Sequence, residues 1–423
     1  MVRFASMPTQ PDWPALLPEV ALDHLAPVAE CATGDALELA RQALDEAGLG
    51  AFLAQAAARG GPLTVVVNDP HRFTDTRSFV EALVTALERE GLSAGELPLR
   101  VLVAAGSHRS TADERARHEA RILGPHAARF AEIAWHDARD GATHRTIGAT
   151  TLHRWMTEGG HYLACGSVEP HYFAGATGAH KTLTVGVMAL ATLTDNHHHA
   201  MSNAVAPLKL RGNPIHEGVL QALGDLEATG ARLLALNQVV IDGTVVACSA
   251  GHPVAALERA LPIVERSFGK RLAHPMDLVI ARVRPPLDRD LYQAEKGIKN
   301  TETGVRDGGV IVLEAACEHG VGLDQFVELL RAAPRHSDAL ATVAARGYRL
   351  GDHKAVRLRA LTDTRAVQVA LVTRGIDAGL AAVLGMTIFS DRASAAAWVS
   401  RRLAPAARGA LVEDAGNVVL LAP

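Results

Sequence analysis

The chain has 423 residues, of which 48% are hydrophobic and 21% charged, with a formal net charge of −4 at pH 7. This composition excludes a disordered or fibrous protein, and the slightly acidic balance offers no basic surface for nucleic acid. No uninterrupted apolar run of about 18 residues marks a membrane span, and the first residues lack the apolar stretch of a secretory signal. We therefore expect a cytoplasmic protein that acts on small molecules, with no nucleic-acid or membrane partner.

The length favours two domains, because one hydrophobic core stops growing at about 250–300 residues. The cysteines lie far apart and form no CxxC pair, which predicts reduced thiols rather than disulfides or a thiolate zinc site. They are Cys31, Cys165, Cys248 and Cys317.

Three β-like apolar runs occupy residues 63–68, 99–106 and 161–168, and an amphipathic stretch at 77–91 separates the first two. Strands that alternate with helices of this length predict βαβ units and a largely parallel sheet. Ligands of such sheets bind at the carboxyl ends of the strands. Each of the three runs is followed by a polar residue suited to a site, and these are Asp69, His108 and His171.

A second series of apolar runs begins at 274–286 and continues at 308–317, 367–373 and 418–423. These runs predict a second α/β domain, with residues 267–275 as the crossing. We expect an N-terminal α/β domain over 1–273, a C-terminal α/β domain over 274–423, and an active-site cleft between them.

Residues 167–202 contain the densest set of reactive side chains. His171 follows a predicted strand, and a glycine-rich loop with Gly175 and Gly178 leads to Lys181. Glycines allow the backbone to approach a ligand closely. The lysine could meet a phosphate or carboxylate, or serve as a point of covalent attachment. Taken alone, a lysine after such a loop is more often a surface residue.

Three adjacent histidines, His197, His198 and His199, follow 16 residues after the lysine. They cannot all face one metal from a helix, because successive residues are turned by about 100°. At most one or two could be ligands, and a neutral imidazole suits nickel, copper, iron or zinc. Alone, the cluster is more often a solvated turn.

Two further groups complete the set: Asp69 with Arg72, and Tyr292 and Gln293 with Lys296. Arg72 offers a guanidinium fork for a carboxylate. Each group has a plain structural alternative, since Asp-Pro is frequent in turns and Gln-x-x-Lys on helix faces. Together with the histidines and Lys181, however, they form a coherent list for a single site.

In order and spacing, these motifs resemble those of the nickel-dependent lactate racemase family. That family carries Asp-x-x-Arg, Gly-x-His-Arg, and Glu-Pro-His before a glycine-rich loop and lysine, followed by Asn-His and then Tyr-Gln-x-x-Lys. The matching residues are Asp69 with Arg72, Gly106 with His108 and Arg109, 169–171 with Lys181, Asn196 with His197, and Tyr292 and Gln293 with Lys296. The chain departs from the usual family pattern at His180 and Val185.

The resemblance implies a nickel-pincer nucleotide, a pyridinium-3-thioamide-5-thiocarboxylic acid mononucleotide carrying nickel, made by separate biosynthesis proteins. It would be attached covalently to Lys181, with His197 as metal ligand and Asp69 in the cofactor region. The implied catalytic residues are His108 and His171. The implied substrate-binding residues are Arg72, Tyr292, Gln293 and Lys296.

The implied function is a racemase or epimerase, an isomerase that inverts C2 of a 2-hydroxy acid by proton-coupled hydride transfer through a 2-oxoacid. Hydride removal avoids the unfavourable carbanion next to an ionised carboxylate. Two alternatives remain at this point: a metal-dependent hydrolase that uses His197 to His199, and a non-catalytic carboxylate- or nucleotide-binding protein.

Overall fold

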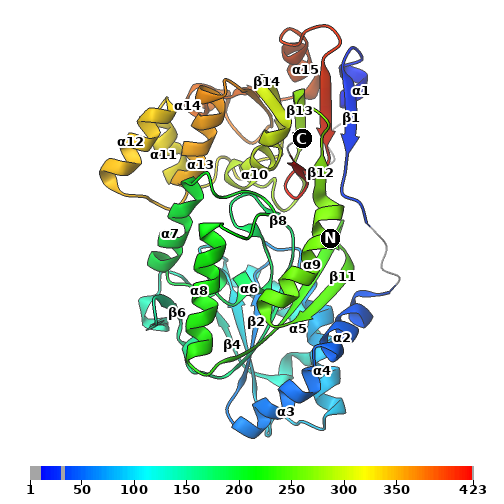
Figure 1. Ribbon diagram of the computed structural model, residues 1–423, viewed down its shortest axis with the longest axis vertical. Coiled ribbons are helices and arrows are strands. Elements are labelled where there is room, and N and C mark those ends of the chain that lie inside the picture. The colour runs from blue at the N-terminus through cyan, green and yellow to red at the C-terminus, as the bar shows by residue number, and fades with distance from the viewer. Residues whose placement is uncertain (1–10, 30–33, 422–423) are drawn as a thin grey trace. The chain divides into compact units, whose positions relative to one another are not determined.

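The computed structural model of the chain describes residues 11–29 and 34–421. Its described part divides into two compact units, one of residues 28–267 and one that joins residues up to Pro27 with those from Phe268 onward. Each unit contains a six-stranded sheet (Figure 1). The prediction of a mixed α/β protein with largely parallel sheets is therefore confirmed.

The 28–267 unit alternates strands and helices, as its apolar runs predicted. The strands of its main sheet are β2 (Leu63–Asn68), β3 (Leu99–Ala104), β4 (Phe130–Trp135), β7 (His161–Ser167), β10 (Arg232–Ile241) and β11 (Thr244–Gly251). Its helices are α2 (Ala36–Glu46), α3 (Leu49–Arg59), α4 (Thr76–Arg89), α5 (Ala112–Leu123), α6 (Ala179–Thr182), α7 (Leu190–His198), α8 (Pro214–Ala228) and α9 (Pro253–Phe268). Two small hairpins are β5 (His144–Ile147) with β6 (Thr150–His153), and β8 (Pro170–His171) with β9 (Gly175–Ala176).

The strand order in this sheet is β11-β10-β7-β2-β3-β4, and all neighbours are parallel except β10 and β11. The chain runs outward from β2 through β3 to β4 and then returns to place β7 on the other side of β2. This reversal makes the carboxyl ends of β2 and β7 a topological switch point, the position where open α/β sheets bind ligands.

The core of the unit forms where α2, α3 and α4 cover one face of the sheet. Alternate strand residues such as Val65, Val67, Val101 and Val103 face these helices and are fully buried. Helix α4 begins where the Asp75 side chain accepts a hydrogen bond from the Ser78 amide, which satisfies one of the free N–H groups of its first turn.

The second unit contains the strands and helices of the C-terminal part of the chain together with a short N-terminal segment. Its strands are β1 (Ala21–Leu25), β12 (Gly269–Arg271), β13 (Met276–Arg282), β14 (Val305–Glu314), β15 (Gln368–Val372), β16 (Thr387–Phe389), β17 (Arg408–Val412) and β18 (Val419–Leu421). Its helices are α1 (Trp13–Leu16), α10 (Leu291–Thr301), α11 (Asp324–Ala332), α12 (His336–Arg346), α13 (Asp352–Arg359), α14 (Ala381–Leu384) and α15 (Arg392–Ser400).

The main sheet of this unit has the order β1-β17-β13-β14-β15-β16, with every neighbouring pair parallel. Here too the chain runs outward, from β13 to β16, and then returns to the other side of β13 with β17. The apolar run at 418–423 does not join this sheet, because its described part, β18, pairs with β12 instead.

The N-terminal boundary differs from the prediction, which assigned residues 1–273 to one domain. Strand β1 pairs with β17, and Trp13 packs in the core formed by β13, β14 and α15. The residues before Pro27 therefore belong to the unit built mainly from the C-terminal part, and that unit begins again at Phe268 rather than at 274.

Cys165, Cys248 and Cys317 are free thiols, as expected, while Cys31 lies outside the described residues. Burial raises the pKa of Cys248 to about 12, so this thiol is protonated at neutral pH. Among the residues that the structure describes, none of the helices is long and apolar enough to cross a bilayer.

Candidate active site

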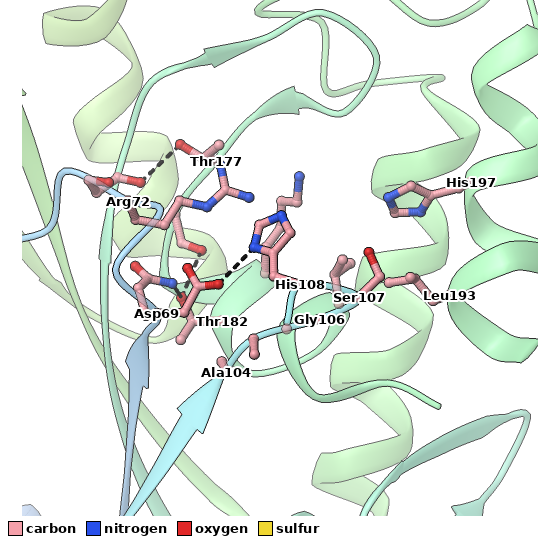
Figure 2. A pocket seen from close by; sticks show the side chains of 17 residues that line it. Asp69, Arg72, Ala104, Gly106, Ser107, His108, Thr177, Thr182, Leu193 and His197 are labelled. Carbon is pink, nitrogen blue, oxygen red and sulfur yellow. Dashed lines mark hydrogen bonds and ion pairs between the residues drawn. The ribbon is translucent and has the colours of Figure 1, made fainter. Parts of the chain in front are cut away.

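A pocket opens at the carboxyl edge of the 28–267 sheet, at the switch point between β2 and β7. It encloses about 620 Å³ not filled by atoms, part of it open to solvent. The walls come from the ends of β2, β3 and β7 and from helices α6 and α7 (Figure 2). Five predicted site residues line it: Asp69, Arg72, His108, Lys181 and His197.

Asp69 and His108 form a hydrogen-bonded pair at the centre of the pocket. His108 Nδ1–H donates to Asp69 Oδ2 over 2.7 Å, the bond drawn in Figure 2. Burial of Asp69 favours its neutral form, but the charges of His108, His71 and Arg72 and the bond from His108 outweigh burial and lower the pKa of the carboxyl. When His108 is neutral, an ionised Asp69 keeps its ring proton on Nδ1, which leaves Nε2 as a proton acceptor.

A chain of short polar contacts holds the ends of β2 and β7 against helix α6. Thr74 Oγ1 donates to Asn68 Oδ1 over 2.7 Å and accepts the Ser167 amide over 2.9 Å. Asn68 Nδ2 in turn donates to Thr182 Oγ1 over 3.0 Å. Because Thr182 directly follows Lys181, these bonds fix the lysine's helical turn relative to both strands.

The loop before Lys181 lies directly on strand β7. A Cβ atom at Gly166 would come within 2.6 Å of the Ala179 amide nitrogen, so only glycine permits this approach. Asn237 Oδ1 accepts the Ala179 N–H over 2.8 Å and anchors the start of α6. Gly178 lines the pocket as expected. Gly175 does not line it, and its backbone instead packs closely against the backbone of Lys209.

Lys181 is buried, with 8% of its surface exposed, which rules out a surface lysine. Burial and the charge of Arg72 lower its pKa to about 7, against a smaller opposing effect of Glu169. A large fraction of this amine is therefore neutral at pH 7, the state in which a lysine acts as a nucleophile.

Only one of the three adjacent histidines lines the pocket. His197 projects from α7, and burial together with the charge of Lys181 lowers its pKa to about 3. Its imidazole is therefore neutral and suited to bind a metal. His198 and His199 are exposed and stack on each other. Of the three histidines, only His197 therefore shares the cavity with Lys181.

His171 is buried on β8 and accepts a weak bond from the Ala174 amide at Nδ1, over 3.3 Å. Its ring lies 4.4 Å from that of Phe173, measured between centroids. Phe173 also lies 5.0 Å from the His197 ring and 5.8 Å from Lys181 Nζ. One aromatic side chain thus contacts His171, His197 and Lys181.

Tyr292, Gln293 and Lys296 lie on the first turns of α10, in the other unit. Asp290 caps this helix by accepting the Gln293 amide, and Lys354 Nζ lies 4.4 Å from the Tyr292 ring centroid. The pocket described above is formed within residues 28–267. Substrate binding by these three residues, and a cleft between the domains, therefore stay predictions.

Several residues that shape the pocket were not among those predicted. They are Asn68, His71, Thr74, Phe173 and Thr182. His71 and Phe173 stand within the predicted motifs, next to Arg72 and two residues after His171, so their position was a usable signal. Nothing in the local sequence around Thr74 indicates that it bonds to a strand almost a hundred residues away.

Comparison with known proteins agrees with the geometry. The lactate racemase N-terminal domain model matches residues 15–207, and the lactate racemase C-terminal domain model matches residues 273–397. The lactate racemase of Thermoanaerobacterium thermosaccharolyticum is 27% identical over 296 residues, which are 67% of each chain. That of Lactiplantibacillus plantarum is 26% identical over 280 residues, which are 64% of this chain and 63% of that one.

Solved structures give the same fold. The lactate racemase apoprotein from T. thermosaccharolyticum superposes with a TM-score of 0.80 at 21% identity, over 95% of each chain. A protein from Thermotoga maritima gives a TM-score of 0.70 at 16% identity, over 92% of this chain and 99% of that one. From its sequence and its fold together, the chain belongs to the lactate racemase family of isomerases.

Proposed function

We propose that this protein inverts the configuration at C2 of a 2-hydroxy acid, with lactate as one candidate substrate. The observation that carries the proposal is the pocket chemistry: a buried lysine with a pKa of about 7 shares one cavity with a neutral histidine and an Asp69–His108 pair. A nucleophilic amine, a metal-type imidazole and a general base are the parts that this reaction needs.

The residues fit a covalently attached nickel-pincer nucleotide. Lys181 would form the amide-type bond, since about half of its amine is neutral at pH 7. His197 would be the protein ligand to nickel, because its imidazole is neutral over the whole physiological range. When bound, the group supplies a hydride acceptor, so that the substrate passes through a 2-oxoacid.

The Asp69–His108 pair would move the hydroxyl proton. His108 Nε2 accepts the proton as the C2 hydrogen leaves, and the ionised Asp69 stabilises the imidazolium that results. His171 would return a proton to the substrate oxygen when the opposite enantiomer forms. Exchange of both histidines with solvent then restores their starting protonation states.

Arg72 would hold the substrate carboxylate through its guanidinium fork, which keeps C2 in one place while the configuration changes. Its position on the pocket wall, close enough to Asp69 and Lys181 to shift the pKa of both, supports this role. Tyr292, Gln293 and Lys296 are proposed to contribute further contacts to the same substrate.

The test uses the full chain produced with nickel in a host that also expresses the cofactor-biosynthesis proteins. Peptide mapping should find the mass adduct on Lys181, and chiral chromatography should detect conversion of one 2-hydroxy acid enantiomer into the other. With substrate deuterated at C2, the product should retain the deuterium, because a hydride is returned to the same carbon.

Loss of the deuterium to solvent would contradict hydride transfer and favour simple deprotonation. An unmodified Lys181 in an active preparation would remove the cofactor from the proposal. Zinc-dependent hydrolysis without an adduct, or carboxylate binding with no turnover, would support the two alternative functions instead.

A further inference from the structure

A third histidine, His71, lies beside the Asp69–His108 pair. The rings of His71 and His108 meet edge to face, with centroids 4.8 Å apart at an interplanar angle of 77°. Each of the three residues presents one potential ligand atom within 4.8 Å of the other two. Over the described ranges, no other group of three His, Cys, Asp or Glu residues converges in this way.

We propose that Asp69, His71 and His108 form a binding site for a divalent transition metal of the zinc type, separate from the nickel ligand His197. Two imidazoles and one carboxylate are a common ligand set for such ions. Three protein ligands leave further coordination positions free. Asp69 and His108 line the pocket, so an ion bound by them would lie at its wall.

The three ligand atoms lie near one point, all within 4.8 Å of one another. His108 Nδ1 and Asp69 Oδ2 are 2.7 Å apart, so they would separate by roughly 0.6 Å to reach the spacing of about 3.3 Å between two tetrahedral ligands that each lie about 2.0–2.1 Å from one ion. His71 is partly buried on the loop after β2, and its ring already packs against that of His108. The Asp69 side chain, which is almost fully buried, would stay in place.

The ligand atoms of this site favour zinc over magnesium or calcium. Asp69 is the single carboxylate of the set, and Arg72 acts on it as a nearby positive charge. Magnesium and calcium require several oxygen ligands, which this set does not supply. Zinc and similar ions bind imidazole strongly enough to tolerate a site with one carboxylate.

If the proposed function holds and His108 is the catalytic base, a metal bound at this site would stop it from acting as one. In the resting pair the ring proton of His108 is on Nδ1 and faces Asp69. A metal bound at Nδ1 takes that position, so the proton moves to Nε2 and no net proton is released. Nε2 then carries hydrogen and cannot accept the substrate's hydroxyl proton.

The binding test uses the full-length apo protein and zinc alone, measured by isothermal titration calorimetry. We expect one zinc ion per chain, and at least about 10-fold weaker binding in the His71→Gln variant. His198→Gln, an exposed histidine, and His197→Gln, the proposed nickel ligand, should bind zinc like the parent chain. Cobalt in place of zinc should give visible absorption that His71→Gln loses, and thermal unfolding without metal checks that each variant is folded.

Equal zinc affinity in the parent and His71→Gln would overturn the proposal, as would a loss of binding in His197→Gln alone. Magnesium binding as tight as zinc binding would also contradict it. In the nickel-loaded enzyme, zinc should inhibit the parent at a concentration at least about 10-fold lower than that needed for His71→Gln. An enzyme without turnover would refute the proposed function, but the calorimetric result would still decide the zinc site.

Discussion

The two units use the same arrangement of parallel strands, yet the carboxyl edges of their sheets differ in kind. In each unit the chain runs outward from a central strand and then returns to that strand's other side, which creates a switch point. In the 28–267 unit, this edge is the pocket that contains Asp69, His108 and Lys181. In the other unit, the corresponding edge between β13 and β17 is filled by paired charges.

The filled edge is built from Arg282, Glu314 and Glu413, which stand at the ends of β13, β14 and β17. Glu314 accepts from the Arg282 guanidinium over 3.2 Å and from the Trp13 indole over 2.8 Å. Glu413 pairs with Arg282 and, over 3.0 Å, with Arg284. The comparison teaches that topology marks where a site can form, while the side chains at the edge decide whether one does.

The largest effect on activity is expected from Lys181→Arg, in the pocket at the carboxyl edge of the 28–267 sheet. Arginine keeps a positive charge but has no amine that can be neutral at pH 7, so the covalent adduct and all turnover should disappear. Peptide mass mapping and chiral chromatography measure both outcomes. The exposed Lys209→Arg is the matched control and should keep adduct and activity; retained activity in Lys181→Arg would refute covalent attachment.

The next largest effect is expected from Asp69→Asn. An amide can donate a hydrogen bond to His108 and reverse its tautomer, which removes the acceptor at Nε2. The turnover number should fall by about 10²–10⁴-fold while circular dichroism stays unchanged. Asp113→Asn, at an exposed position in the first turn of α5, should not alter turnover. A similar rate in both variants would show that Asp69 does not orient His108.

Glu314→Gln tests the filled edge. The substitution removes the ion pairs with Arg282 and Arg392 and leaves two guanidinium groups, each with 19% of its side chain exposed, without this carboxylate. Breaking such a buried pair should lower the free energy of unfolding by about 3 kcal/mol, as measured by urea denaturation.

The control for that substitution is Arg306→Gln, whose partner Asp277 is part of an exposed pair. It should cost less than about 1 kcal/mol. If Glu314→Gln also changed the reactivity of Lys181 in the folded protein, the two edges would not be independent in function.

The smallest effect concerns the pH dependence of the Lys181 amine in the apo protein. Burial lowers the pKa to about 7, so the neutral, reactive fraction rises as the pH increases through 7 and is nearly complete at pH 8. The rate of acylation by a small reagent, followed by peptide mapping, should increase about 10-fold from pH 6 to pH 8 and then level off. A rate that keeps rising to pH 10 would indicate an ordinary, solvated lysine.

Much of the fold could be predicted because local patterns carry it. The runs at 63–68, 99–106 and 161–168 correspond to β2, β3 and β7, and the amphipathic stretch at 77–91 corresponds to α4. The start of α5 is a capping box formed by Thr111 and Glu114, a feature of neighbouring residues. The pairing of β1 with β17 joins residues almost 400 positions apart, and no local pattern reports such a contact.

In the site, too, the sequence predicted the residue types, while contacts between distant segments appeared only in the structure. Asp69, Arg72, His108, Lys181 and His197 were predicted from motif order, and one pocket contains all of them. Phe173 was missed as the contact between His171 and His197: its place two residues after His171 marked it as near the site, but the sequence does not show which side chains it packs against. The convergence of His71 with Asp69 depends on the turn after β2, which the sequence alone does not define.

By itself, the sequence determined which residues end the parallel strands and which chemical groups they carry, since both follow from apolar runs and residue types. Only the tertiary structure decided that Lys181 is buried with a pKa near 7 and that Phe173 packs against both His171 and His197. The physical reason is that burial and charge act through space. Both depend on which distant segments pack against a side chain, and those contacts exist only in the folded chain.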